Sequence, residues 1–137
     1  MDLQALVTDN VTELLVKIVE FTEKRQKVLI RNINHMHSAG FVPMDLPVDE
    51  FSEVLNTAID EHIHNNRLVL CDTRNVRFSS DGELDVEPIV DDSAAALFSD
   101  DPDEYLRAQV DKLLENALNQ RVAAELLRDR EGFAGIS

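Results

Sequence analysis

Apolar residues recur at intervals of three and four along residues 3–33, which is the spacing of one face of an α-helix. The steps alternate between four and three, the heptad rhythm that lets two helices pack as a coiled coil. The same rhythm places Arg25 and Asn32 on this face, where polar residues can fix the register of packing. Such a helix is about 45 Å long, so we expect it to need a partner. The apolar positions are Val7, Val11, Leu14, Ile18, Phe21 and Val28, flanked by Leu15, Val19, Leu29 and Ile33.

A second apolar face of the same kind runs through residues 105–137. Asp101 as N-cap, Pro102 at the first helical position and Glu104 two residues later predict where this helix starts. Gly132 and Gly135 are expected to end it. Its predicted apolar positions are Leu106, Val110, Leu113, Ala117, Ala124 and Leu127, with Gln120 on the same face.

Residues 41–104 predict a shorter helix after the turn His37–Phe41. Gly40 is the natural residue for a left-handed turn, and Pro43 and Pro47 prevent immediate continuation. Pro47 then suits the first turn of a new helix, together with two acidic residues that follow it. The apolar face of this helix comprises Phe51, Val54, Leu55, Ala58, Ile59 and Ile63.

The pattern of short apolar runs in residues 67–90 predicts a small β-ribbon, and a linker is expected to follow it. Short apolar runs at 68–70, 76–78 and 84–89 flank the turn Asp81–Gly82, and Pro88 makes the last an edge strand. Residues 91–103 have the composition of an acidic linker. We therefore predict a mainly α protein whose long terminal helices pair as a coiled coil, divided into residues 1–40, 41–104 and 105–137.

The charged residues are distributed unevenly along the chain. Residues 1–40 and 105–137 each hold five acidic and five basic side chains, whereas residues 41–104 hold 17 acids and three bases. The formal net charge of −14 therefore comes entirely from the middle, and it disfavours nucleic acid or anionic lipid as a partner. Two neutral terminal helices can pack against each other or against copies of themselves. The pattern indicates assembly rather than catalysis.

Candidate chemistry is sparse. The pairs His35/His37 and His62/His64 suggest a zinc site, but two side chains two residues apart on a helix point in different directions, so solvated polar pairs are favoured. The single cysteine, Cys71, excludes an internal disulfide, and we expect it to be a buried structural thiol. No phosphate-binding loop or nucleophile elbow is present. We expect no enzyme activity, cofactor or small-molecule substrate.

Two separated segments resemble the terminal motifs of bacterial flagellar basal-body rod proteins. The segment Phe21–Phe41 is similar to the N-terminal form RQ-x-x-L-A-x-N-I-A-N-x-x-T-P-G-Y, and Leu113–Leu127 is similar to the C-terminal form M-A-E-N-x-L-x-Y-Q-A-L-x-x-L-L. The chain departs from the family where His35 replaces the second Asn, Ala39 the turn Pro and Gln120 a common aromatic residue. The matching residues are Arg25, Gln26, Leu29, Asn32, Ile33, Gly40, Glu115, Asn116, Leu118, Leu126 and Leu127.

The order, spacing and length are most similar to the proximal rod proteins of that family. The resemblance implies a structural subunit whose terminal helices assemble into the rod, with other rod subunits and the rod-base adaptor as partners. It also implies a periplasmic rod location reached by flagellar export, without a cleaved signal peptide and without membrane insertion. The expected assembly residues are Val7, Val11, Leu14, Ile18, Phe21, Val28, Leu29, Asn32, Ile33, Gly40, Leu106, Val110, Leu113, Asn116, Ala117, Leu118 and Leu127. A small acidic adaptor or chaperone that binds partner helices is the alternative.

Overall fold

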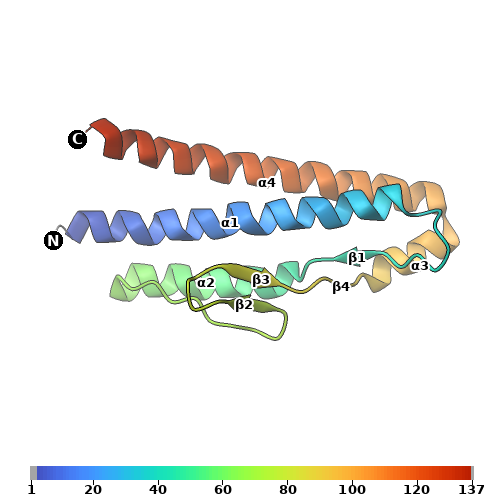
Figure 1. Ribbon diagram of the computed structural model, residues 1–137, viewed down its shortest axis with the longest axis horizontal. Coiled ribbons are helices and arrows are strands. Elements are labelled where there is room, and N and C mark those ends of the chain that lie inside the picture. Colours follow the sequence, from blue (N-terminus) through green and yellow to red (C-terminus); the bar gives the residue numbers. More distant parts are fainter. Residues whose placement is uncertain (1–2, 137) are drawn as a thin grey trace.

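Two long antiparallel helices dominate the fold. The computed structural model describes the backbone of residues 3–136 and the side chains of residues 10–130. Helix α1 spans Leu3–Asn34 and α4 spans Pro102–Ile136. They lie side by side along most of their length, and the shorter α2, Val48–Asn65, lies along the other side of α1 (Figure 1). The expectation of a mainly α fold with long terminal helices is confirmed.

The turn after α1 forms as its glycine predicts. Gly40 has a φ of +71°, in the left-handed region that glycine adopts without a steric penalty. The chain then forms the two-residue strand β1, Met44–Asp45, before Pro47 caps α2. Asn66 ends α2 in a left-handed conformation, with its N–H bonded to the last carbonyls of the helix.

The predicted β-ribbon is present, but its neighbours differ from expectation. β2, Val76–Phe78, pairs antiparallel with β3, Leu84–Val86, around a turn in which Gly82 has a φ of +84°. The run at 68–70 forms no strand, because no neighbouring backbone pairs with it. β4, Ile89–Val90, pairs instead with β1, far away in the sequence.

Two further expectations were wrong, one for the segment before α4 and one for the C-terminal end of α4. The expected linker 91–103 contains a helix, α3, Asp92–Asp100, because the Asp91 side chain accepts from Ala94 N at 3.0 Å and caps three consecutive alanines. The N-cap of α4 forms as predicted, with Glu104 N donating to Asp101 Oδ1 at 3.2 Å. However, α4 continues through Gly132 and Gly135 to Ile136.

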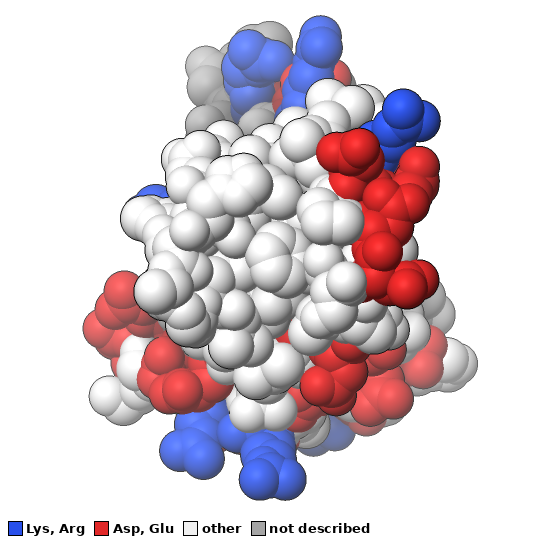
Figure 2. Space-filling view, turned by 90° about the vertical axis from the view of Figure 1, so that its right-hand side faces the viewer, with Lys and Arg blue, Asp and Glu red and all other residues white. Residues whose placement is uncertain are grey.

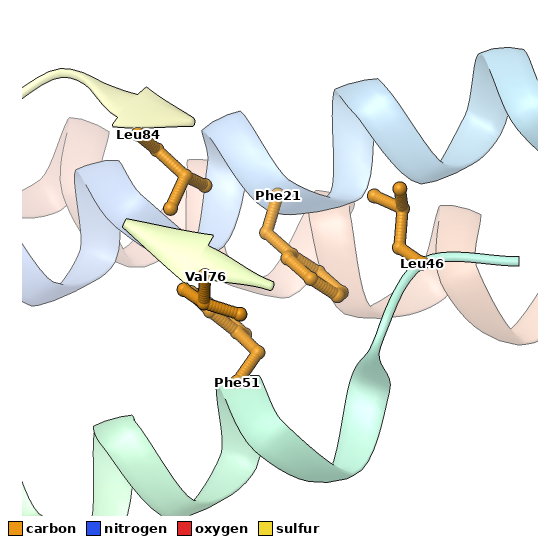
Figure 3. Close-up of a cluster of buried hydrophobic side chains, with 5 residues drawn as sticks. All are labelled: Phe21, Leu46, Phe51, Val76 and Leu84. Carbon is orange, nitrogen blue, oxygen red and sulfur yellow. The ribbon is translucent and has the colours of Figure 1, made fainter. Parts of the chain in front are cut away.

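The hairpin packs over the junction of α1 and α2 and encloses the main core cluster. Phe21 and Phe51 stack with ring centroids 4.1 Å apart and an interplanar angle of 4°. Leu46, Val76 and Leu84 pack around this pair (Figure 3). Because the cluster joins α1, α2, β2 and β3, the acidic middle region is held firmly against the N-terminal helix.

A second cluster lies where α1 turns back. Met36, Ala94 and Tyr105 are buried there, and Phe41 and Phe98 pack against them. The three aromatic rings meet edge to face, with the centroids of Phe98 and Tyr105 4.9 Å apart, a favourable geometry for aromatic pairs. This cluster fixes α3 to the start of α4.

Candidate assembly surfaces

The face of α4 that packs on α1 is more polar than expected. Its buried residues are Tyr105, Gln109, Asn116 and Ala123. Each directly precedes a position of the predicted apolar face, namely Leu106, Val110, Ala117 and Ala124. One residue corresponds to a rotation of about 100° around a helix. The face of α4 that is buried within the subunit is therefore rotated by about a quarter of a turn from the predicted apolar face.

The predicted face of α1 agrees better with the structure. Leu14, Phe21, Leu29 and the polar Arg25 and Asn32 are buried, whereas the other described apolar positions of that face, Val11, Ile18, Val28 and Ile33, are half-buried. The side chain of Val7 lies outside the described residues. In α4, Leu113 and Leu127 are half-buried and Leu118 is exposed.

Asn32 connects three segments of the chain. Its Nδ2 donates to Met44 O at 2.7 Å and to Gln109 Oε1 at 2.9 Å, and its Oδ1 accepts from Met44 N at 3.1 Å. The Tyr105 hydroxyl donates to the backbone oxygen of Asn32 at 2.9 Å. One amide side chain therefore positions β1 and α4 against α1.

Asn116 makes the corresponding contact nearer the middle of the helix pair. Its Nδ2 donates to Thr22 O at 2.8 Å, and Asn116 is 1% exposed. A backbone carbonyl has two acceptor lone pairs, so Thr22 O can accept this bond from within a helix, and the Thr22 hydroxyl donates to Ile18 O and Val19 O in the preceding turn. Among the described side chains, Gln109 Nε2 is the one buried nitrogen without a hydrogen-bond partner. The buried amides therefore connect α1 to α4 by hydrogen bonds at two points along the helix pair.

A partly buried cluster of charged side chains also joins these segments. Arg25 donates to both carboxylate oxygens of Asp45, at 2.9 and 3.0 Å, and Lys112 Nζ lies 2.6 Å from Asp91 Oδ2. Burial opposes ionisation of Asp91, but hydrogen bonds from Lys112 and Ala94 hold its pKa below the usual value. The ion pairs connect α1 to β1, and α4 to the start of α3. Sequence reasoning placed Arg25 and Asn32 on the packed face but missed Tyr105, Gln109, Lys112 and Asp91.

Most of the described large apolar residues of α4 are exposed instead. Six of them recur every four residues and are 37–64% exposed, and we call this row the outer stripe. Single exposed apolar residues are ordinary, but a continuous row along a helix marks an interaction surface. The outer stripe comprises Leu106, Val110, Leu114, Leu118, Val122 and Leu126.

A second uncharged surface lies at the end of the molecule where α1 turns back. Figure 2 shows this end, with charged side chains at its margin and uncharged residues across its centre. Residues 34–43 and 93–99, which meet there, contain no Asp, Glu, Lys or Arg. Gly40 and the half-buried Phe41, both in the segment that resembles the rod motif, belong to this end.

The candidate chemical residues do not converge on a site. Among the described residues, no group of three or more His, Cys, Asp or Glu side chains is placed to hold a metal ion. His64 Nδ1 lies 2.9 Å from Asp60 O, and His62 Nδ1 lies 3.5 Å from Asn10 Nδ2. Cys71 is exposed, so the expectation of a buried thiol was wrong, because residues 67–73 form an irregular surface segment.

Comparison with protein-family models, with curated proteins and with solved structures gave no match for this chain. None of the described helices is both long and apolar enough to cross a membrane. The function is therefore inferred from the contacts, burial and charge of the described residues, and from the resemblance of the two terminal segments to the rod motifs.

Proposed function

We propose that this chain is a non-enzymatic structural subunit of the bacterial flagellar basal-body rod, of the proximal-rod type. The observation that carries the proposal is the outer stripe. α4 buries amides against its own α1 and exposes leucine and valine, an arrangement that suits a subunit whose apolar surface is covered by neighbours. The equal numbers of acids and bases in residues 105–137 allow like subunits to approach along this helix.

The residues that resemble the rod motifs have clear structural roles, which supports the proposal. Asn32 positions β1, Asn116 bonds to α1, and Gly40 makes the turn at the uncharged end. In an assembled rod, the paired α1 and α4 would form a coiled-coil layer of the inner tube. The acidic middle region would then face outward into the periplasm. Its partners would be copies of this chain, other rod subunits and the rod-base adaptor.

The test replaces two residues of the outer stripe in a flagellated host that carries the gene. Leu114→Gln with Leu118→Gln removes apolar surface where the side chains are 64% and 62% exposed, so folding should be retained. Arg107→Gln with Arg121→Gln is the matched control, because both arginines are exposed on the same helix. Basal bodies are purified and assayed for the protein by immunoblot, and swimming is measured.

We expect the wild-type and control proteins to co-purify with basal bodies, and the stripe variant to remain outside them with motility lost. Circular dichroism of the purified variant should match that of the wild type. A wild-type protein that is absent from purified basal bodies would refute the rod assignment. Normal incorporation of a folded stripe variant would refute assembly through the outer stripe.

A further inference from the structure

A groove runs between α2 and α4, with α1 as its floor. It has a volume of about 350 Å³, and all of its lining residues come from these three helices. Its apolar lining comprises Leu15, Ile18, Phe21, Val48, Phe51, Leu55, Val122, Ala123 and Leu126. A channel bounded by two helices that flank a third is the shape into which an amphipathic helix packs.

The groove adjoins a strongly acidic hollow at one end. The hollow has a volume of about 580 Å³ and shares Arg25 and Val48 with the groove. Six carboxylates line it, from Asp45, Asp49, Glu50, Asp91, Asp92 and Glu115, and Arg25 is the one basic residue among its lining residues.

Only part of this negative charge is neutralised within the chain. Asp45 pairs with Arg25, and Asp91 pairs with Lys112. The side-chain nitrogen of Asn75 donates to a carboxylate oxygen of Glu50, and this hydrogen bond lowers the pKa of Glu50. Within the described side chains, the exposed Asp49, Asp92 and Glu115 form no ion pair. Arg25 is already occupied by Asp45, so the hollow presents a net negative surface to a ligand.

We propose that the groove and hollow together bind an amphipathic helix of another protein, with its apolar face in the groove and lysine or arginine side chains at the end that enters the hollow. The apolar lining supplies the burial and the carboxylates supply orientation and partner choice. A second copy of this chain is disfavoured as the occupant, because its residues 1–40 and 105–137 each balance five acids with five bases and its middle region is acidic, so none of these regions brings a net positive charge to the hollow. The proposal goes beyond assembly through the outer stripe, since it identifies a second partner by its charge.

The test uses a fluorescent synthetic peptide of the same length as α2, 18 residues. The peptide carries leucines at helical spacing on one face and lysines in its last turn. A second peptide has glutamates in place of these lysines. Binding to the purified full chain is followed by fluorescence anisotropy at about 50 and about 200 mM salt, which brackets the range over which exposed charges become screened. Sedimentation velocity of the protein alone runs in parallel.

Two matched charge reversals locate the site. Asp49→Lys with Glu115→Lys alters the hollow, and Asp85→Lys with Glu87→Lys alters two exposed acids on and next to β3 that line neither the groove nor the hollow. All four side chains are exposed, so both variants should fold. Val122→Gln with Leu126→Gln tests the apolar part, because these two residues at the end of the outer stripe also line the groove and are each 49% exposed. Leu114→Gln with Leu118→Gln, in the part of the stripe that does not line the groove, should leave peptide binding unchanged.

We expect the lysine peptide to bind and the glutamate peptide to bind at least about tenfold more weakly, with affinity falling at the higher salt concentration. The hollow variant should lose about tenfold in affinity for the lysine peptide, the groove variant should lose a similar factor, and the β3 control should bind as the wild type does. Equal binding of both peptides, an equal loss in the β3 control, or no binding at all would overturn the proposal. So would a stable dimer that the groove substitutions dissociate, since a second copy would then occupy the groove.

Discussion

Replacing Asn32 with alanine should destabilise the fold far more than its position on a long helix suggests. The side chain makes three hydrogen bonds, two to the backbone of Met44 and one to Gln109. Each is worth a net contribution of about 1 kcal/mol, so their loss costs about 3 kcal/mol. The true cost lies above this value because Met44 and Gln109 are left without partners in a site where Asn32 is 2% exposed.

The matched control is Asn34→Ala, two residues further along α1, where the side chain is exposed. Surface substitutions of this type change stability by less than about 0.5 kcal/mol. Urea unfolding followed by far-UV circular dichroism gives both free energies, and the melting temperature of the Asn32 variant should fall by roughly 12 °C if 1 kcal/mol corresponds to about 4 °C for a domain of this size.

A third variant separates hydrogen bonding from lost volume. Asn32→Asp keeps the shape of the side chain and the acceptor for Met44 N, but its carboxylate cannot donate to Met44 O or Gln109 Oε1. It should be at least as unstable as the alanine variant at neutral pH. If Asn32→Ala costs no more than Asn34→Ala, or if Asn32→Asp is as stable as the wild type, the amide does not join the three segments.

Two further predictions concern ionisable groups. Burial, with a smaller contribution from Asp91, raises the pKa of Tyr105 to about 12, whereas an unfolded tyrosine ionises near 10. The free energy of unfolding should therefore fall as the pH rises from about 10 to about 12. Burial lowers the pKa of Lys17, but its hydrogen bonds with Glu13 and Glu20 raise that pKa above its usual value, so part of the fall should persist in Tyr105→Phe. The fall should be smaller in Tyr105→Phe than in the wild type, and an equal pH dependence of the two proteins in urea titrations would contradict this. Arg25→Lys should cost about 1–3 kcal/mol in urea unfolding, because lysine cannot reproduce the two-point contact with Asp45; a loss below about 0.5 kcal/mol would show that a point charge suffices.

The sequence predicts where the helices of this fold lie better than it predicts which face of each helix is buried. Apolar spacing identifies α1, α2 and α4 because each is long enough for its period to repeat several times. On α1 the same spacing also identifies Leu14, Phe21 and Leu29 as buried. On α4 it selects the neighbouring face, because hydrophobic periodicity cannot distinguish a face buried within the subunit from one left for a partner. Gln109 and Asn116 give no apolar signal, although hydrogen bonds with Asn32 and with Thr22 O offset part of the cost of burying their amides.

The errors in the middle region have other physical causes. The strands β1 and β4 are two residues long, too short for any alternation to be visible, and their pairing depends on the turn at Gly40 returning the chain. Helix α3 was missed because acidic residues on both sides give it the composition of a linker. Its signal was local: an aspartate followed by Ser93 and three alanines. The groove could not be predicted, since it depends on how α2 and α4 are placed on either side of α1.

The four-residue spacing of the outer stripe also constrains how a neighbouring helix can lie on it. Four residues turn a helix by 400°, so each step moves the stripe about 40° around α4. A row of this kind is inclined by about 26° to the helix axis. Two such rows that interlock place their helices at about 50° to each other, whereas a heptad seam holds them near 20°. The six residues span five such steps, so the stripe turns about 200° around α4 and a straight neighbouring helix can cover only part of it. Such a neighbour crosses α4 obliquely, and successive subunits joined in this way would be rotated relative to one another rather than stacked in line.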